Sequence, residues 1–388
     1  MSAFRFSRVE LRNWRNFSKA DVPLARRVFL VGPNASGKSN FLDVFRFLRD
    51  LVIDGGGLAK AVHARDGMSK LRSLFARTST NVEVRVDVVN EHIGWRYELA
   101  FTHESAKNPR PIVAHERVVR REGATEVQVF TRPSDDDKRD PKRRAQTFIQ
   151  QVTKNEDFRE LAEFFAEISY LHLVPHLVRE GQPSLPGAIG LDPFGRDLLD
   201  GIRATPKRAR DARLKRIQDV LAIVAAPLSN LELVADGSGR PHLQVRFKHW
   251  RPQGAYQSEQ QFSDGTLRLI GLLWSLQEKT GPLLLEEPEL SLHSALVRKL
   301  APFIHRAQRT GNGRQVILST HSVDLLMDPG IAAEEVLLVQ PTNEGSEVAD
   351  GASLKDVSRL MTAGIPASEA VLPLTSAAQL PLFDATPI

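Results

Sequence analysis

The sequence predicts an α/β fold: a core of parallel strands and helices, an antiparallel β layer and a helical insertion. Three observations support this prediction. The short apolar run Val28–Val31 is followed by a glycine-bearing loop and then, from Lys38 to Leu51, by apolar residues at helical spacing. Segments of strand-like alternation come next. Helical patterns then separate them from a second region in which helices and strands alternate.

The first third of the chain is rich in expected strands. Apolar residues that alternate with polar ones, as at Val82–Val88, are typical of a sheet with one covered face, so these strands predict the antiparallel layer. Strands are expected at Phe4–Leu11, Val28–Val31, Val82–Val88, Trp95–Phe101, Val113–Arg120 and Glu126–Phe130. The stretch Pro133–Arg144 is dense in charge with a proline near each end, which predicts an exposed loop.

The remaining two thirds begin with helical patterns and return to alternation. Helices are expected at Phe158–Ile168, Lys207–Val224, Leu267–Leu276 and Leu292–Arg309, and strands at Leu231–Val234, Leu243–Phe247, Leu283–Glu286, Gln315–Ser319 and Val336–Val339. The last stretch, Ala370–Ile388, is rich in Pro, Ala, Leu and Thr without periodicity, which predicts a loosely held tail or docking segment.

The 388 residues are enough for more than one structural unit. We predict an N-terminal part of the core at 1–130, a helical insertion lobe at 131–230, a C-terminal part of the core at 231–350, and a C-terminal helix and tail at 351–388.

Composition narrows the class of protein. The net charge of +5 allows a polyanionic partner without demanding one. No apolar run is long enough to span a bilayer, and Arg5, Arg8 and Glu10 interrupt any signal-peptide pattern, so we expect a cytoplasmic protein without membrane contact. The chain has no cysteine, which excludes disulfides, thiolate metal sites and thiol nucleophiles.

A phosphate-binding loop is the strongest motif. Gly32-Pro33-Asn34-Ala35-Ser36-Gly37-Lys38-Ser39 fits the pattern G-x-x-x-x-G-K-[ST] between an expected strand and an expected helix. Glycines let backbone N–H groups curl around phosphates, Lys38 neutralises the β- and γ-phosphate oxygens, and Ser39 offers its hydroxyl to Mg²⁺. The alternative is a glycine turn that happens to precede Lys-Ser, and the flanking elements argue against it.

Carboxylates follow the expected strand Leu283–Glu286. Such a strand delivers acids to the sheet edge where phosphates bind. We assign Glu286 to Mg²⁺ and Glu287 to the attacking water. Taken alone, the Leu-Glu-Glu-Pro sequence would more often be a strand that runs into a solvated turn.

Two weaker signals complete the candidate site. His321 follows an apolar strand, where it can contact a γ-phosphate or the attacking water, although a lone histidine there is usually structural. Ser263 and Gly265 precede an apolar helix and can present a hydroxyl and backbone N–H groups to phosphate. The alternative for Ser263 is a plain helix N-cap, and both interpretations can hold at once.

Taken in chain order, the four motifs resemble those of the ABC ATPase superfamily, with Walker A at Gly32–Ser39, a signature at Ser263–Thr266, Walker B at Leu283–Glu287 and a switch histidine at His321. The likeness is to the soluble RecF, SMC and OLD-like branch, often labelled AAA-type ATPase domains. The opening Leu11–Phe17 looks like that branch's N-terminal strand and turn. The phosphate loop typical of that branch continues for one more residue, here Asn40. The resemblance therefore implies that Asn40 also binds nucleotide.

The resemblance implies an ABC-ATPase head that binds ATP and Mg²⁺. It also implies a homodimer in which the signature Ser263 of one copy reaches the γ-phosphate held by the other copy's loop. This sequence departs from the pattern in three ways: Glu286 replaces the commoner aspartate, no clear Q-loop glutamine appears although Leu171–Arg179 can take its place, and no long coiled-coil arm is present, which argues against a true SMC-type protein.

The resemblance implies an ATPase switch that controls a separate effector, of nuclease or Toprim-like type, in bacterial defence against phage or plasmid DNA. No nuclease centre is expected in this chain, because Asp350, Asp356 and Asp384 are scattered. A transporter ATPase subunit is disfavoured by the signature and the N-terminal strand.

The alternative is a RecF-like ATPase that binds double-stranded DNA in repair. Its candidate phosphate contacts are Lys138, Arg139, Lys142, Arg143, Arg144, Lys207, Arg208, Arg210, Arg213, Lys215 and Arg216. A solvated helix face and a mobile loop explain these charges equally well.

Overall fold

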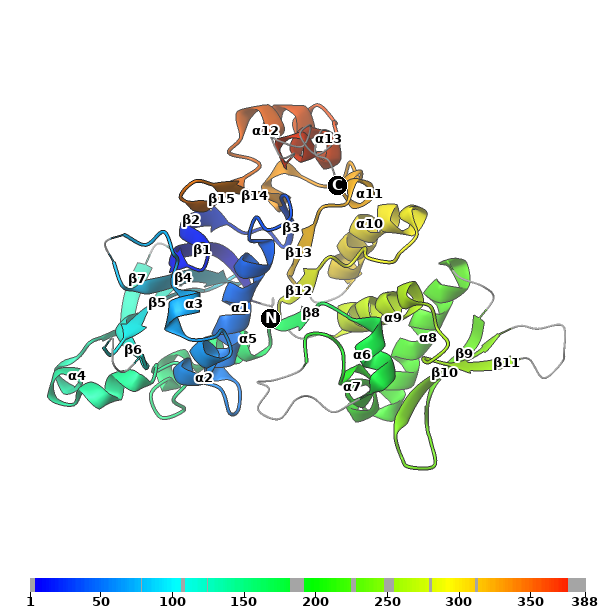
Figure 1. The fold of residues 1–388 in the computed structure, drawn as a ribbon, viewed down its shortest axis with the longest axis horizontal. Coiled ribbons are helices and arrows are strands. Elements are labelled where there is room, and N and C mark those ends of the chain that lie inside the picture. Colours follow the sequence, from blue (N-terminus) through cyan, green and yellow to red (C-terminus); the bar gives the residue numbers. More distant parts are fainter. Residues whose placement is uncertain are drawn as a thin grey trace, which may run out of the picture.

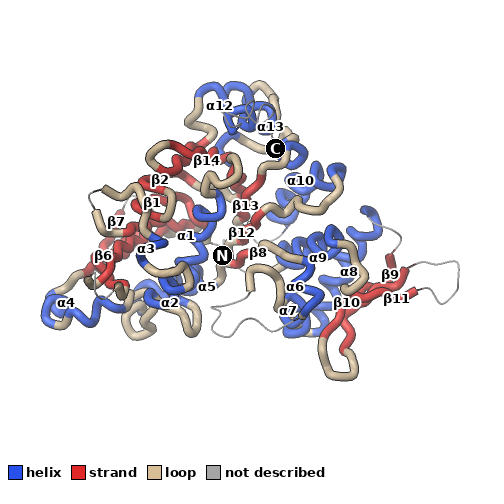
Figure 2. The backbone as a smooth tube through the Cα atoms, in the orientation of Figure 1, coloured by secondary structure: helices blue, strands red, loops and turns tan. Residues whose placement is uncertain are grey.

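The residues that the structure describes form three β-sheets and the helices around them, shown as a computed structural model in Figure 1. The structure describes residues 4–77, 79–105, 109–123, 125–181, 192–224, 228–247, 255–278, 281–310 and 313–375. Figure 2 distinguishes helices from strands in the same orientation. In the described part of the chain, no helix combines the length and apolarity needed to cross a membrane.

The core sheet is parallel except at one edge, with the order β15-β14-β3-β13-β12-β8. Its strands are β3 (Arg27–Val31), β8 (Ser169–Leu171), β12 (Leu283–Glu286), β13 (Val316–Thr320), β14 (Val336–Thr342) and the antiparallel β15 (Gly345–Asp350). All residues of β3 and β13 are buried, because helices or the second sheet cover both faces. This burial explains their unbroken apolar sequence.

The antiparallel layer has the strand order β2-β1-β4-β5-β6-β7. Its strands are β1 (Arg5–Trp14), β2 (Phe17–Pro23), β4 (Val82–Val89), β5 (Gly94–His103), β6 (Pro111–Glu122) and β7 (Thr125–Arg132). The alternating valines of β4 all face the hydrophobic core. The expected strands of this region are therefore confirmed.

Helix α1 (Lys38–Val52) packs between the two larger sheets. Its apolar residues share one buried cluster with side chains from β1 and β4 on one side and with Leu30 and Ile317 on the other. Three helices surround this cluster: α2 (Leu58–His63), α3 (Met68–Leu71) and α5 (Arg159–Ala166). The helix that begins at the phosphate-loop motif is thus fixed from both sides.

A second lobe has its own hydrophobic cluster. It contains α6 (Pro175–Glu180), α7 (Leu198–Ala204), α8 (Lys207–Val224), α9 (Asp264–Gln277) and a small sheet of β9 (Leu228–Ala235), β10 (Pro241–Phe247) and β11 (Ala255–Ser258). Residues expected to form one lobe, 131–230, divide between two clusters, because Phe148 and α5 pack with the antiparallel layer. The α/β class with a helical insertion is as predicted.

The C-terminal part covers the other face of the core sheet. It contains α10 (Ser294–Thr310), α11 (Val323–Leu326), a short turn of helix η3 (Ala333–Glu335), α12 (Lys355–Thr362), α13 (Ala367–Val371) and η4 (Leu372–Thr375). The expected tail therefore begins later than predicted, because Ala370 and Val371 are buried in this cluster. Residues 376–388 lie outside the described residues.

The predicted exposed loop Pro133–Arg144 is wrong in its central part. It forms α4 (Asp135–Arg139) and η1 (Pro141–Ala145), and η2 (Glu156–Phe158) follows before α5. Ser134 and Asp137 make a capping box at the start of α4. The Asp137 carboxylate is buried because it pairs with Arg132 at the end of β7, a partner that local sequence does not reveal.

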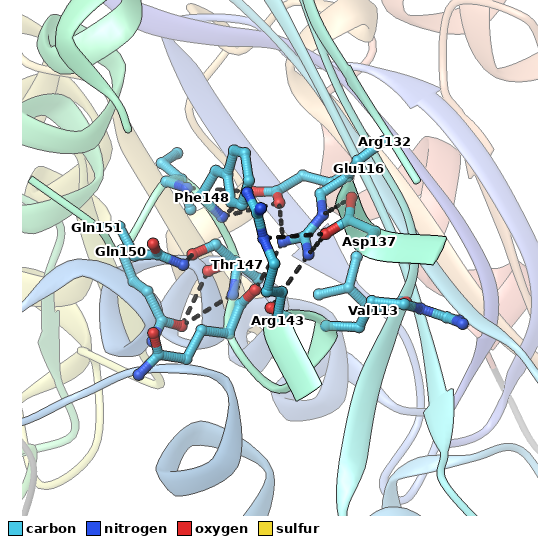
Figure 3. A network of polar contacts seen from close by, with 12 residues as sticks. Val113, Glu116, Arg132, Asp137, Arg143, Thr147, Phe148, Gln150 and Gln151 are labelled. Atoms are coloured by element: carbon cyan, nitrogen blue, oxygen red, sulfur yellow. Dashed lines mark hydrogen bonds and ion pairs between the residues drawn. The ribbon is translucent and has the colours of Figure 1, made fainter. Parts of the chain in front are cut away.

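A buried polar network surrounds Arg132 (Figure 3). Its guanidinium donates to both carboxylate oxygens of Asp137, at 3.1 and 2.6 Å, and stacks 4.2 Å from the centre of the Phe148 ring. Glu116 lies 3.7 Å from the guanidinium and accepts hydrogen bonds from the Phe148 and Ile149 amides. Two buried carboxylates thus share one cation.

We expect Arg132→Met to lower the free energy of unfolding by about 3–5 kcal/mol, because it removes the buried cation beside Glu116 and leaves Asp137 with only Arg143, 3.9 Å away. Chemical denaturation monitored by circular dichroism measures this loss. The matched control is Arg12→Met on β1, whose exposed side chain lies 3.9 Å from Glu83, and it should cost less than about 1 kcal/mol. Equal losses in the two variants would contradict the stabilising role of the network.

Candidate functional site

The motif Gly32–Ser39 forms the turn between β3 and α1. Its tip is exposed at Asn34 and Ala35, whereas Ser36 is buried. Gly32 leaves no space for a side chain, since an added Cβ would lie 2.2 Å from the Val339 carbonyl oxygen. Gly37 has a φ of 104°, which only glycine adopts readily. The loop geometry therefore requires glycine at both positions.

Asn16, in the turn between β1 and β2, braces this loop. Its amide nitrogen donates to the Ser36 carbonyl at 3.0 Å and to the Ser346 hydroxyl at 2.6 Å. Its amide oxygen accepts from the Asn40 side chain at 2.7 Å. Asn40 was expected to bind nucleotide, and the structure places its side chain on Asn16. Sequence reasoning did not single out Asn16, although it lies in the N-terminal turn that carries the family resemblance.

The Lys38 ammonium lies within the loop. It donates to the carbonyl oxygens of Gly32 and Pro33, at 2.8 and 2.9 Å. Burial lowers the pKa of Lys38, although the nearby carboxylates of Glu287 and Glu286 oppose this shift. Among the described residues, the ammonium donates its hydrogen bonds to backbone carbonyls, and phosphate oxygens would be stronger, charged acceptors in their place.

Glu286, the last residue of β12, accepts hydrogen bonds on both carboxylate oxygens. Ser39 donates to Oε1 and the Tyr170 hydroxyl donates to Oε2. Burial raises the pKa of Tyr170, and the Glu286 carboxylate raises it further, so the hydroxyl remains a donor. His172 lies close by, with Nδ1 3.4 Å from the Glu286 carbonyl oxygen. Tyr170 was missed because only the pairing of β8 with β12 brings it here.

Glu287 lies just beyond the strand and approaches the predicted histidine. Its carboxylate is 3.1 Å from Nδ1 of His321, which follows β13. The backbone of Glu287 has a φ of 44°, a left-handed conformation that is uncommon for this residue type and costs of order 1–3 kcal/mol. Backbone strain of this kind is often found at functional sites. The two residues therefore meet at the carboxyl ends of adjacent strands.

A third carboxylate, Glu289, was not assigned a role from the sequence. It is buried and accepts a 2.5 Å hydrogen bond from the Thr320 hydroxyl. Burial raises its pKa. In the described part of the chain, its second oxygen and the hydroxyls of Ser36 and Ser319 are buried without hydrogen-bond partners.

The side-chain oxygen atoms at the end of β12 are suitable ligands for a small hard cation such as Mg²⁺. The hydroxyl of Ser39 and the carboxylate of Glu286 are in contact, and both are oxygen ligands of the kind that Mg²⁺ takes alongside phosphate oxygens and water. The residues present therefore fit a Mg²⁺–triphosphate group.

The signature residues lie elsewhere in the same chain. Ser263 is exposed and caps α9: its hydroxyl accepts from the Thr266 amide at 3.2 Å and lies 2.8 Å from the Thr266 hydroxyl. Gly265 follows in the first turn. Figure 1 shows α9 beside α8 in the second lobe, whereas α1 lies beside β3 and β13. Among the described residues, no side-chain hydrogen bond or ion pair joins Ser263 to the phosphate loop.

Many of the basic residues considered for DNA contact have local partners. Arg210 pairs with Asp211, Lys215 with Asp219, Lys138 with Asp135 and Arg143 with Asp136, while Arg216 donates to Gln277. Such pairing is typical of an ordinary solvated surface.

The scattered acids do not meet in the described chain. Asp350 accepts from the Ala352 amide and Asp356 lies 3.6 Å from Arg359, while Asp384 lies outside the described residues.

Comparisons with known proteins agree with the fold and the motifs. Residues 27–328 match the family described as "AAA domain, putative AbiEii toxin, Type IV TA system". Among curated proteins, the chain is 34% identical over 80 residues to Endonuclease GajA of Bacillus cereus (strain VD045). That match covers 20% of this chain and 14% of the length of the endonuclease.

Solved structures show the same fold. An SmcHead bound to the C-winged helix domain of ScpA has a TM-score of 0.52 at 16% identity, over 89% of this chain and 96% of that one. The Smc head domain with a coiled coil and joint derived from Pyrococcus yayanosii has a TM-score of 0.50 at 13% identity, over 93% and 99% of the two chains. At these identities the likeness concerns the fold alone.

Proposed function

Because this chain belongs to the family of P-loop ATPases described as "AAA domain, putative AbiEii toxin, Type IV TA system", we propose that it binds ATP with Mg²⁺ at the loop Gly32–Ser39 and hydrolyses it when two copies close around the nucleotide. One observation carries this proposal. The carboxyl ends of the core strands carry three groups: Lys38, the Ser39–Glu286 pair and the Glu287–His321 pair. Phosphate, metal and water would meet there.

Each residue has a distinct task in this proposal. The loop amides and Lys38 hold the β- and γ-phosphates, and Pro33, Asn34, Ala35 and Ser36 contribute the turn that presents the amides. Ser39 and Glu286 hold Mg²⁺, which when bound neutralises charge on the phosphate oxygens. Glu287 accepts the proton of the attacking water, and His321 orients the Glu287 carboxylate and contacts the γ-phosphate.

A second copy is proposed because, among the described residues, no side-chain hydrogen bond or ion pair joins Ser263 to the phosphate loop of its own chain. Ser263 and Gly265 lie at the exposed N-terminus of α9, where a hydroxyl and backbone N–H groups can face an anion. We propose that these groups contact the γ-phosphate held by the other copy. ATP then stabilises the closed dimer because only that state completes both sites.

We further propose that the dimer acts as a switch for a separate effector protein, of nuclease or Toprim-like type, in cytoplasmic defence against phage or plasmid DNA. The likeness to Endonuclease GajA over 80 residues supports a nuclease as the effector chemistry. The proposal assigns nuclease chemistry to the partner. Native co-purification followed by mass spectrometry identifies that partner.

We expect Lys38→Ala to weaken nucleotide binding about 10- to 100-fold, because a charged hydrogen bond contributes about 1.5–3 kcal/mol and each factor of ten is about 1.4 kcal/mol. Isothermal titration calorimetry with a non-hydrolysable ATP analogue and Mg²⁺ measures the change. The control is Lys70→Ala on α3, which removes an exposed lysine. Unchanged affinity in Lys38→Ala would place the nucleotide elsewhere.

A further inference from the structure

The edge strand of the core sheet brings a tyrosine to the carboxylate proposed to bind Mg²⁺. Strand β8 pairs in parallel with β12, with Tyr170 beside Leu284. From this position the Tyr170 hydroxyl reaches across to Oε2 of Glu286, while Ser39 donates to Oε1. One carboxylate oxygen is thus held from the edge of the sheet, and the other faces the phosphate loop.

The tyrosine ring is itself fixed. Arg46, on the helix that starts at the phosphate loop, stacks its guanidinium 4.4 Å from the ring centre. The same guanidinium lies 3.7 Å from Asp43, a buried carboxylate that Arg65 holds with hydrogen bonds of 2.9 Å. The Tyr170 hydroxyl therefore has a defined position relative to both α1 and β12.

A glutamate needs such support more than an aspartate does. Its side chain has one more rotatable bond, so fixing the carboxylate in one place costs more conformational entropy. A hydrogen bond to one oxygen selects the rotamer that leaves the other oxygen toward Ser39. Residues that orient a metal ligand without touching the metal commonly set its affinity in this way.

We propose that Tyr170 is a positioning residue that holds Glu286 in its Mg²⁺-binding orientation. The proposal rests on the nucleotide site described above and adds a residue outside its four motifs. It also gives a reason why glutamate serves at position 286: the longer side chain spans the distance between the edge-strand hydroxyl and the loop serine.

The test compares two tyrosines that each donate to a glutamate. Tyr170→Phe removes only the hydroxyl at the site. The matched control Tyr97→Phe removes the 3.0 Å hydrogen bond to Glu116 inside the antiparallel layer, where backbone amides also hold that carboxylate. For each protein, binding of a fluorescent, non-hydrolysable ATP analogue is titrated with Mg²⁺ and repeated in EDTA.

In Tyr170→Phe we expect the Mg²⁺ concentration for half-maximal stimulation of binding to rise roughly tenfold, because outer contacts of metal ligands typically contribute at least that factor. Binding in EDTA should stay as in the native protein. Tyr97→Phe should lower thermal stability without changing the Mg²⁺ dependence. A purely structural Tyr170 would instead reduce stability and leave the Mg²⁺ titration unchanged, which would overturn the proposal.

Glu286→Asp provides a second, independent arm. Removal of one methylene withdraws the carboxylate by about 1.5 Å, the length of a carbon–carbon bond, so it no longer reaches Tyr170. Adding Tyr170→Phe to this variant should then have no further effect on the Mg²⁺ titration. A full additional loss in the double variant would contradict action through Glu286. If the native protein bound no nucleotide at any Mg²⁺ concentration, the proposed function itself would fail.

Discussion

Glu287→Gln is expected to accumulate a nucleotide-bound dimer and to lower the rate of ATP hydrolysis by about 10²–10⁴-fold. Glutamine keeps the size and hydrogen-bonding capacity of the side chain but cannot accept the proton of the attacking water. The native carboxylate lies 3.1 Å from Nδ1 of His321, so the substitution also replaces a carboxylate contact of that ring nitrogen with an amide contact. Phosphate release measures the rate, and size-exclusion chromatography with light scattering measures the dimer.

The control for this variant is Glu163→Gln on α5, which removes an exposed carboxylate far along the chain from the site motifs. It should hydrolyse ATP at the native rate and form no long-lived dimer. Normal turnover by Glu287→Gln would remove Glu287 from its assigned role. Loss of turnover without a trapped dimer would show that hydrolysis does not limit the opening of the dimer.

Ser263→Arg is expected to abolish ATP-driven dimerisation. The exposed hydroxyl at the start of α9 is proposed to face the partner's γ-phosphate, and the longer side chain would prevent that approach while α9 itself stays folded. Loss of the N-cap costs about 1 kcal/mol of stability, which thermal unfolding measures separately. Light scattering with and without the non-hydrolysable analogue reports the dimer.

Two further variants test whether the bulk of the arginine at position 263, and not the loss of the N-cap or the added charge, prevents dimerisation. Ser263→Ala removes the cap without adding bulk, and it should weaken the dimer less than Ser263→Arg does. Thr362→Arg adds the same charge on α12, an exposed helix in the C-terminal part, and should dimerise normally. An ATP-dependent dimer of Ser263→Arg with native stability would contradict a site shared between two copies.

Elements with strong local signals could be predicted from the sequence. The helix expected at Lys207–Val224 has the same bounds in the structure, because its apolar residues recur at helical spacing along one side. The strand expected at Val28–Val31 begins one residue earlier, at Arg27. The phosphate loop was also evident, because its geometry demands glycine at positions 32 and 37 and so constrains the sequence itself.

Features that depend on distant partners could not be predicted. Asp137 lies in a stretch of charged residues, and the sequence alone does not show that Arg132, at the end of β7, is its buried partner. Tyr170 and Glu286 are 116 positions apart, and only the pairing of β8 with β12 joins them. The roles assigned to Glu287, His321 and Ser263 stay predictions, and the variants above test them.

The separate hydrophobic clusters of the two lobes bear on how the molecule can move. Helix α9 contributes most of its buried side chains to the cluster of the second lobe and Leu272 to that of the core sheet, and Leu171 and Leu292 also pack against both of these clusters. Packed side chains, and not the connecting segments alone, therefore join α9 to the core sheet, so a displacement of α9 relative to that sheet would have to repack Leu272 and its neighbours.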